Sequence, residues 1–277
     1  MKPLPLNDYK LAISKLREVT INNLFARSVV EQHVNGKIYV DAIAIPKAFY
    51  VIHPYGMSLL YGDVSDDFLQ SELTDYLLGR NGLRKTGEWL QIFPSELENR
   101  IDTILGKKLS IFDGNKYRDN SGDVVVKHKR INFKFNLQKF QQFRRKIDLN
   151  EYSFCEVDID LYNETNGSVV PNKFWNNASE FLTRGVGFAL MAKDQAAAIA
   201  FSSFMHDEML ELGMETKLEY RRRGFASIIS AKLIEYCLER GLEPVWACRQ
   251  GNLGSYNLAI KLGFEPIAYL PYYELLI

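Results

Sequence analysis

The sequence predicts an α/β (α+β) fold: a mixed, mostly antiparallel twisted sheet with flanking helices in the second half, preceded by an N-terminal α+β domain. Two apolar runs, residues 185–192 and 196–204, are joined by three polar residues and predict a hairpin. A strand at residues 208–217 then runs through a basic, glycine-marked turn into residues 227–241, where apolar side chains recur at the three- and four-residue steps of a helix.

The composition is that of an ordinary globular protein. The 277 residues contain 34 Lys and Arg against 34 Asp and Glu, so net charge gives no attraction to nucleic acid or to a membrane surface. The chain starts without an apolar signal core, and no apolar run approaches the ~20 residues of a membrane span. Three cysteines without metal-ligand spacing predict a reduced, cytoplasmic protein with no metal site. Oligomeric state is not readable from these features.

The first half alternates short helices and strands and contains no chemical motif. We predict one domain at residues 1–145 and a second at residues 146–277. The order of elements in the first domain also fits a degenerate copy of the second. Its expected elements are a long helix at residues 8–34, strands at 37–50 and 51–61, a helix from a Ser65 cap to 78, a strand at 89–93, a helix from Pro94 to about 105, and strands at 123–136 broken by a basic run.

The second half is more regular. Its further expected elements are a basic helix at residues 137–147, an exposed strand of alternating acids at 154–163, a short helix at 174–182, an apolar strand at 244–248, a helix from Asn252 to Gly263, and an aromatic strand pair at 267–277.

The basic turn has the features of a cradle for pyrophosphate. It carries three arginines, Arg221, Arg222 and Arg223, directly before the helix. The free N–H groups of a first helical turn point outward, and the helix dipole favours an anion there. Gly224 lets the backbone approach a ligand closely, and the small Ala226 keeps the turn open. Three consecutive arginines in a neutral chain are poor grounds for nucleic-acid binding, which we do not predict.

The spacing Arg221-x-x-Gly224-x-Ala226 resembles the (Gln/Arg)-x-x-Gly-x-(Gly/Ala) signature of the GNAT superfamily of N-acetyltransferases. The strand at 244–248 and a helix ending in Lys-x-Gly-Phe follow in the order that this family shows. The Glu-Thr before the turn, the Pro-x-Trp-x-Cys strand and the Leu-Ala-x-Lys-Leu-Gly-Phe ending are also similar to a bacterial branch that includes a self-resistance acetyltransferase for the antibiotic zwittermicin. The resemblance covers residues 174–277.

The resemblance implies acetyl-CoA as cosubstrate and assigns residues to it. The fourth and fifth strands of this fold splay apart, and pantetheine pairs with the free backbone of the fourth strand, here Glu215, Thr216, Lys217 and Leu218. The pyrophosphate is expected on Arg221, Arg222, Arg223, Gly224, Phe225 and Ala226. The pantetheine arm is expected beside Asn252 and Ser255. The first domain is then expected to be a helper that shapes the acceptor cleft, an expectation that rests on its position alone.

For the base that deprotonates the acceptor amine, we favour Glu215 first and Glu211 second. The two are four residues apart on a regular strand and therefore share a face. A carboxylate acts as a general base near neutral pH when its pKa is raised or when it works through a water molecule. The competing interpretation is that both are ordinary solvent-facing strand residues.

The sequence departs from the family at one position. Many members carry a tyrosine before Lys-x-Gly-Phe as general acid for the leaving thiolate, and this chain has Ala259 there. Tyr256 lies one turn earlier and cannot be equated with it. The thiolate then leaves without that tyrosine, or Cys248 or Trp246 lines the site instead.

The function predicted is an acetyl-CoA-dependent N-acetyltransferase that acts on the amine of a small molecule, such as an antibiotic or an amino metabolite. The alternative is a non-catalytic acyl-CoA-binding sensor or scaffold, which needs the phosphate turn but no base. O-acetylation and a longer acyl donor stay open, and the acceptor is not readable because acceptor loops vary freely.

Overall fold

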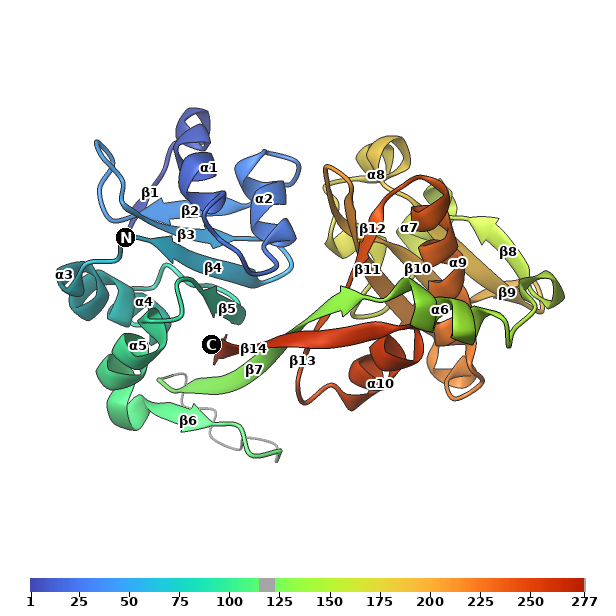
Figure 1. Cartoon of the computed structure of the whole chain (residues 1–277). Helices are drawn as coiled ribbons and strands as arrows, with labels where there is room; N and C mark the ends of the chain where they lie inside the picture. Colours follow the sequence, from blue (N-terminus) through green and yellow to red (C-terminus); the bar gives the residue numbers. More distant parts are fainter. Residues whose placement is uncertain (115–122, 277) are drawn as a thin grey trace. The chain divides into compact units, whose positions relative to one another are not determined.

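The chain forms two compact units in the computed structural model, which describes residues 1–114 and 123–276 (Figure 1). Unit 1 consists of Met1–Ile131, Arg249–Gly251 and Tyr269–Ile277, and unit 2 of Asn132–Cys248 and Asn252–Ala268. The expected boundary after residue 145 differs from this division, because the chain passes into unit 2 after Ile131 and later returns to unit 1. The assignment of the two halves as helper and cofactor domain stays a prediction.

Unit 1 is built on a mixed sheet. Its first four strands are antiparallel neighbours: β1 (Lys2–Pro3), β2 (Lys37–Val40), β3 (Ala48–Ile52) and β4 (Met57–Gly62). Strand β5 (Glu88–Ile92) then pairs parallel to β4. The sheet continues through β14 (Phe264–Leu275), β7 (Val125–Phe135) and β13 (Ala247–Arg249), with β6 (Leu109–Ile111) beside β7. By residue range, β7, β13 and β14 each contribute to both units.

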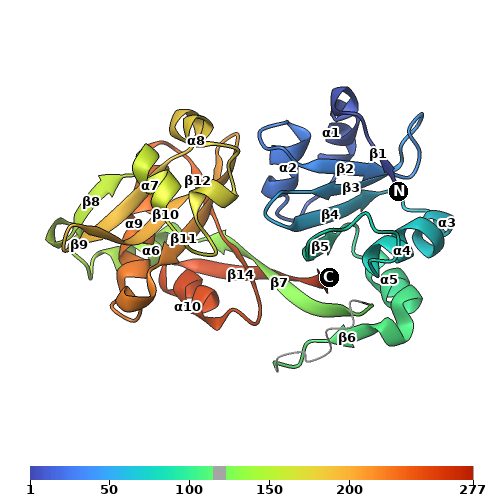
Figure 2. The ribbon, with the colours of Figure 1, turned by 180° about the vertical axis from the view of Figure 1, so that it is seen from behind.

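Helices cover the unit 1 sheet on opposite faces (Figure 2). After the short η1 (Leu6–Asp8), α1 (Lys10–Leu16) and α2 (Leu24–Val30) pack on β3 and β4, where the Tyr61 hydroxyl donates to the Ala12 carbonyl at 3.1 Å. The other face packs against α3 (Asp66–Phe68), η2 (Leu69–Leu73), α4 (Thr74–Leu77) and α5 (Leu97–Leu105), and η3 (Gly106–Lys108) follows α5. Within this core, Glu88 accepts hydrogen bonds from the hydroxyls of Tyr50 (3.0 Å) and Tyr76 (2.5 Å).

Three expectations for the first half were wrong. The long helix at 8–34 is two helices, because Asn22 accepts from the N–H of Leu24 and Asn23 donates to the Val19 carbonyl, which diverts the backbone bonds between them. The strands at 37–50 and 51–61 are three strands. The basic run at 127–130 does not break β7, because Lys127 pairs with Glu98 (2.7 Å) and Asp102 of α5. The Ser65 cap is confirmed by its bond from the Phe68 N–H at 3.3 Å.

Unit 1 contains a buried histidine that predicts acid sensitivity. His53 is 1% exposed, its Nδ1 accepts from the N–H of Tyr55 at 3.0 Å, and burial lowers its pKa to about 3. Between about pH 6.5 and pH 3, His53 therefore takes up a proton when the protein unfolds. Burying the neutral ring is favoured above pH 6.5, and the folded state loses stability as the pH falls below that value.

We expect the free energy of unfolding to fall by about 2 kcal/mol from pH 7 to pH 5 on account of His53. Urea titrations at the two pH values measure this, and His53→Gln should remove that part of the difference. The matched variant His33→Gln, at a partly exposed position, should keep it. Equal pH dependence in His53→Gln and wild type contradicts the prediction.

Unit 2 contains the second sheet, in the order β12-β11-β10-β9-β8. Antiparallel pairing joins β8 (Ser153–Glu156), β9 (Gly187–Ala192), β10 (Gln195–His206) and β11 (Met209–Thr216). Strand β12 (Glu243–Val245) pairs parallel to β11. The predicted hairpin is the β9–β10 pair, and its turn residues Lys193 and Asp194 have positive φ angles of 51° and 61°.

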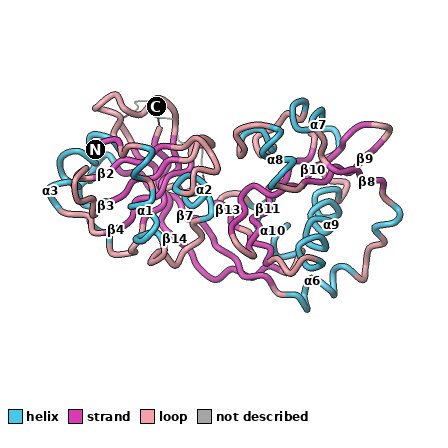
Figure 3. The backbone as a smooth tube through the Cα atoms, turned by 90° about the horizontal axis from the view of Figure 1, so that it is seen from above, coloured by secondary structure: helices cyan, strands magenta, loops and turns pink. Residues whose placement is uncertain are grey.

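The sheet of unit 2 lies between helices (Figure 3). The long α9 (Phe225–Glu239) covers one face by packing on β9, β10 and β11. The other face is covered by α7 (Ile159–Glu164), η5 (Pro171–Lys173) and α8 (Ala178–Arg184). Phe201 of β10 lies on that face, and a Cβ on Gly213 would come within 2.6 Å of its ring. The remaining elements are α6 (Leu137–Arg144), η4 (Leu149–Glu151), η6 (Leu218–Tyr220) and α10 (Leu253–Lys261).

Three expectations for the second half also need correction. The exposed strand at 154–163 ends at Glu156, because Asp158 caps α7 by accepting from the N–H of Leu161 at 2.9 Å. The apolar strand at 244–248 is divided at Trp246 into β12 and β13. The strand pair at 267–277 is the single strand β14, and Ile277 lies outside the described residues. The predicted fold class, with its mixed sheets and flanking helices, is confirmed.

The glycine of Lys-x-Gly-Phe is required by a close backbone approach. Gly263 has φ +90°, and a Cβ there would lie 2.5 Å from the Phe140 nitrogen and 2.9 Å from the Asn136 oxygen. Gly263→Ala should lower the free energy of unfolding by about 2–4 kcal/mol in urea titrations. Gly254→Ala is the control: its Cβ would meet Asn252 Oδ1 at 3.7 Å inside α10, so stability should be unchanged or slightly raised. Equal effects of both variants contradict the prediction.

The two units repeat one arrangement of strands. In unit 1, antiparallel strands lead to β4, a helical crossover follows, and β5 returns parallel to β4. In unit 2, antiparallel strands lead to β11, α9 follows, and β12 returns parallel to β11. This correspondence supports the interpretation of the first half as a degenerate copy of the second.

Candidate active site

The candidate site starts where β11 and β12 part. Their parallel register ends at Glu211 opposite Val245, while β11 continues beside β10 as far as Thr216. After Val245 the chain turns at the buried Trp246 and enters β13, which belongs to the other sheet. The last five residues of β11 therefore pair with β10 on one side and have no strand partner among the described residues on the β12 side.

The backbone direction decides which residues of β11 present their main-chain groups to this unpaired side. The N–H of Glu243 donates to the Glu208 carbonyl at 2.6 Å, and the N–H of Lys217 donates to the Ala197 carbonyl at 3.0 Å. Because main-chain groups alternate along a strand, even-numbered residues of β11 point toward the β12 side. Of the residues predicted to pair with pantetheine, Thr216 has this orientation, and the even-numbered Met214 joins it. The main-chain groups of Glu215 and Lys217 are directed to β10.

The basic turn connects β11 to α9. Arg222 has φ 63° and Gly224, the N-cap of α9, has φ 82°. No side chain caps the helix, and a Cβ on Gly224 would have nothing within 4 Å. The amides of Phe225 and Ala226 open the first turn, where N–H groups have no intrahelical acceptor. The turn is thus an open, uncapped anion site of the kind that pyrophosphate occupies.

The three arginines are exposed and are held in different ways. Arg221 donates through Nε to the Thr216 carbonyl (3.1 Å) and through Nη2 to Glu215 Oε1 (3.2 Å). Arg223 lies over the ring of Tyr220 at 5.3 Å, and that ring stacks on Phe225. Leu218, in the turn between strand and arginines, is 76% exposed.

Two polar features near the turn were not predicted: the side-chain role of Thr216, which was assigned through its backbone, and the contact that Lys261 makes. The hydroxyl of Thr216 is buried and has no hydrogen-bond partner among the described residues. Lys261 donates to the Ser227 hydroxyl at 3.0 Å, which brings a cation to the first turn of α9, where the dipole disfavours it. A bound anion would offset that charge, so these groups fit a phosphate ligand. No sequence signal connects Ser227 with Lys261, because they lie 34 positions apart.

The carboxylate of Glu215 is 14% exposed and accepts four hydrogen bonds. Oε2 accepts from the N–H of Ser168 (2.9 Å), the hydroxyl of Ser168 (3.2 Å) and the N–H of Val169 (3.2 Å), and Oε1 accepts from Arg221. A Cβ on Gly167 would lie 2.7 Å from the Glu215 Cγ, so a glycine is needed there. Glu215 therefore joins the loop before η5 to the arginine turn.

The other candidates lie farther along the same strand and in α10. Glu211 is 5% exposed, at the last residue that pairs with β12. Asn252 caps α10 through the N–H of Ser255 (3.1 Å), and the Ser255 hydroxyl accepts from the Trp246 indole N–H (3.1 Å). Ala259 is fully buried. Asn252 and Ser255 thus fix the position of Trp246 at the point where the strands part.

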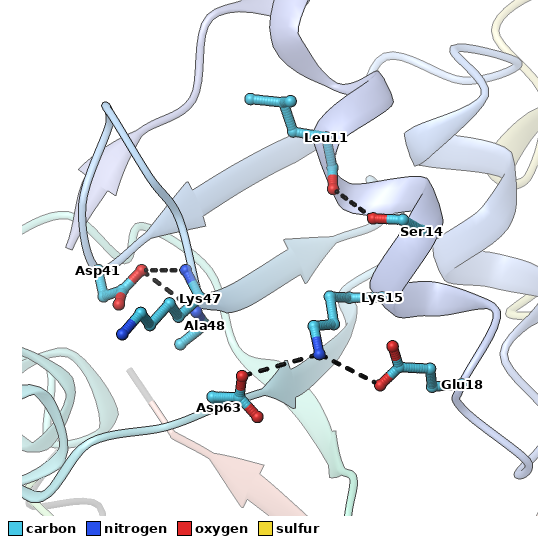
Figure 4. A network of polar contacts seen from close by, with 8 residues as sticks. All are labelled: Leu11, Ser14, Lys15, Glu18, Asp41, Lys47, Ala48 and Asp63. Atoms are coloured by element: carbon cyan, nitrogen blue, oxygen red, sulfur yellow. Dashed lines mark hydrogen bonds and ion pairs between the residues drawn. The ribbon is translucent and has the colours of Figure 1, made fainter.

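The corresponding turn of unit 1, after β4, has the opposite chemistry (Figure 4). Asp63 faces Lys15 of α1 at 3.7 Å, and Lys15 also contacts Glu18. The helix that follows is capped by the Ser65 hydroxyl and begins with two acids, Asp66 and Asp67. In the neighbouring turn between β2 and β3, Asp41 accepts from the N–H groups of Lys47 and Ala48 (Figure 4).

Parallel strands that part beside an uncapped basic turn are the arrangement that the resemblance in the sequence predicts. A family model described as GNAT acetyltransferase matches residues 16–273, and the chain belongs to this family. The predictions of an acetyltransferase and of GNAT membership are thereby confirmed.

Known proteins agree with this assignment. The chain is 26% identical over 252 residues to the uncharacterized N-acetyltransferase YdfB of Bacillus subtilis (strain 168), covering 90% of each protein. In fold it is similar to a GCN5-related N-acetyltransferase-like protein from Streptococcus suis 89/1591 (TM-score 0.68, 23% identity, 98% and 99% covered). It is also similar to a tandem GNAT protein from the clavulanic acid biosynthesis pathway (TM-score 0.57, 11% identity, 99% and 97% covered).

Within residues 1–114 and 123–276, none of the helices has the length and apolar character required to cross a bilayer. The same residues contain no group of three or more His, Cys, Asp or Glu side chains arranged to hold a metal ion.

Proposed function

We propose that the protein is an acetyl-CoA-dependent N-acetyltransferase that transfers acetyl directly to the amine of a small molecule. The observation that carries the proposal is the uncapped turn at Gly224, at the end of a strand whose parallel neighbour has turned away. A helix start without a side-chain cap and with arginines around it leaves its N–H groups for an anion.

The cofactor would bind along the end of β11, the arginine turn and the start of α10. Arg221, Arg222, Arg223, Gly224, Phe225 and Ala226 would hold the pyrophosphate, with Ser227 and Lys261 adding a cation to the same turn. The pantetheine arm would pair with Met214 and Thr216, extend along Lys217 and Leu218, and pass Asn252 and Ser255 near Trp246. The buried Thr216 hydroxyl would gain a partner in the arm.

The chemistry requires a proton acceptor. Acetyl-CoA supplies the acetyl group as a thioester; a C–N bond forms to the amine and the C–S bond breaks. Glu215 is our first candidate for the base that takes the proton from the ammonium, and Glu211 is the second. Arg221 now occupies Oε1 of Glu215, and we infer that this guanidinium turns toward the pyrophosphate when the turn is filled. Oε1 then becomes available to the amine, while the loop N–H groups still orient Oε2.

The acceptor is proposed from the closer resemblance. The Glu215-Thr216 pair, the strand around Trp246 and the Lys261-x-Gly263-Phe264 ending resemble the corresponding segments of the zwittermicin-resistance branch. We therefore propose an aminated antibiotic or an amino metabolite as acceptor, and a reaction in the cytoplasm. The similarity to a tandem GNAT protein is consistent with a first half derived from the same fold.

The alternative is a non-catalytic acyl-CoA-binding module. Two observations favour it: Ala259 stands where many family members have a general acid, and the Glu215 carboxylate holds a loop and the arginine turn together through four hydrogen bonds. Such a module would keep the phosphate turn and use Glu215 only to hold the loop.

The test combines binding with turnover. Calorimetric titration with acetyl-CoA should show binding near micromolar affinity, and release of the CoA thiol should then be measured across aminated antibiotics and amino metabolites. Amine-dependent thiol release supports the enzyme, whereas binding without turnover across the panel supports the module. Absence of acetyl-CoA binding overturns both.

A further inference from the structure

The Glu215 carboxylate joins the arginine turn to a loop, and all the residues concerned belong to unit 2. We call residues 165–170, between α7 and η5, the Ser168 loop. Oε1 of Glu215 accepts from Arg221 Nη2 at 3.2 Å, whereas Oε2 accepts from the N–H groups of Ser168 (2.9 Å) and Val169 (3.2 Å). The Glu215 side chain is 14% exposed, so these protein groups, more than water, determine the position of the carboxylate.

Arg221 occupies two groups that the proposed reaction needs. Its Nε donates to the Thr216 carbonyl at 3.1 Å, on the side of β11 where the pantetheine arm would pair. Its Nη2 holds Glu215, the first candidate for the base. The guanidinium is 55% exposed and belongs to the same turn as the uncapped Gly224, where the pyrophosphate would bind. The arm would therefore compete for the Thr216 carbonyl, and the pyrophosphate for the guanidinium itself.

The other two arginines of the turn lack this link. Arg223 lies over the Tyr220 ring at 5.3 Å. In the part of the chain that the structure describes, neither Arg222 nor Arg223 is bonded to Glu215. Both can attract an anion to the turn without touching the carboxylate. Arg221 and Arg223 are therefore a matched pair of exposed cations in one turn, of which Arg221 is connected with the loop and Arg223 is not.

We propose that Arg221 is a positioning residue that links occupancy of the cofactor turn to the Ser168 loop, acting through Glu215. This inference rests on the proposed function. Without ligand, the carboxylate is bonded to the guanidinium and to the loop N–H groups at the same time. When the cofactor takes Arg221, the negative charge of Glu215 is left to the N–H groups of Ser168 and Val169. Their hydrogen bonds then strengthen, because an N–H group binds an acceptor more strongly when that acceptor carries more charge. The loop thus tightens on the base when the cofactor is bound.

The first test needs no ligand, because removal of the guanidinium imitates its capture by the cofactor. In ¹H–¹⁵N spectra and hydrogen-exchange measurements of the full chain, Arg221→Met should move the Ser168 and Val169 amide protons downfield. It should also slow their exchange at least about threefold. Arg223→Met should leave both amides as in wild type. Unchanged amides in Arg221→Met, or equal changes in the two variants, overturn the proposal.

The second test adds acetyl-CoA to the same three proteins. In wild type, the Ser168 and Val169 amide protons should move downfield saturably, with the midpoint that calorimetry gives for acetyl-CoA. Both variants should bind acetyl-CoA about tenfold more weakly, because each has lost one cation from the turn. At saturation, Arg223→Met should show the full wild-type shift at the loop, and Arg221→Met should show no further shift. A loop response in Arg221→Met as large as that of wild type overturns the proposal.

The two proposals fail in different ways. Failure of the proposed function appears as absent acetyl-CoA binding in wild-type calorimetry, which also removes the ligand that the link requires. Failure of the link alone appears as normal acetyl-CoA binding in wild type, with loop amides that do not respond or that respond equally in Arg221→Met and Arg223→Met.

Discussion

Gly224→Glu should abolish acetyl-CoA binding, with a loss of at least about 100-fold in affinity, or roughly 2.7 kcal/mol. The position is exposed, adopts φ 82° and directs a side chain into open space at the start of α9. A carboxylate there would occupy the anion site and repel the pyrophosphate, and the positive φ would add backbone strain. Calorimetric titration of both proteins measures the change.

The matched control is Gly241→Glu. Gly241 follows the other end of the same helix, is also exposed and has φ 69°, and a Cβ at this position would likewise have nothing within 4 Å. Both variants should cost about 1 kcal/mol of folding stability, because each forces a carboxylate residue into a left-handed conformation. Only the Gly224 variant should lose acetyl-CoA binding. Equal binding by the two variants would remove the arginine turn as the cofactor site.

Glu215→Gln should lower kcat by about 10²–10⁴-fold while weakening acetyl-CoA binding by no more than about threefold. The amide keeps the size of the side chain and can still accept from the N–H groups of Ser168 and Val169, but it cannot take a proton. Without a base, the reaction depends on the free-amine fraction of the acceptor. The variant's rate should therefore rise tenfold per pH unit below the pKa of the acceptor amine, and the wild-type rate should rise less steeply.

A structural role for Glu215 gives a different pattern. Gly167→Ala disturbs the loop contact, because its Cβ would lie 2.7 Å from the Glu215 Cγ, yet it leaves the carboxylate in place. If Glu215 only holds the loop, Gly167→Ala and Glu215→Gln should lose activity to a similar extent and with the same pH dependence as wild type. That result would transfer the role of base to Glu211.

The second half was predictable because its local signals agree with one another. The period of α9, the positive-φ turn at Lys193 and Asp194, and the glycines at 224 and 263 each have one favourable structure. The division of the apolar strand at Trp246 was not visible, since no glycine, proline or charge marks it. Its cause is pairing with two different sheets, which is a property of the whole fold. The broken helix before Leu24 was missed for a related reason, because apolar spacing continues across the two asparagines.

The parts of the candidate site whose residues are contiguous in the sequence were predictable. The arginine turn and its glycine are contiguous, so their chemistry can be read directly. The contacts of Glu215 with Ser168 and Val169 span 47 and 46 positions, and the contact of Lys261 with Ser227 spans 34. Nothing in the spacing of such residues indicates that they meet. The same holds for Trp89, His128 and Tyr272, whose rings meet although their strands are far apart in the sequence.

The return of β14 to unit 1 has a consequence for biosynthesis. Tyr272 to Leu275 pair with β5, and Arg84 donates to the Leu275 carbonyl at 3.1 Å. The strand partner of β5 is therefore made of residues that leave the ribosome after all of unit 2. Until then, the nascent first unit presents an unpaired strand edge, which invites association with other chains. Unit 2 can meanwhile acquire most of its contacts. The half that begins the chain is therefore the half that finishes folding last.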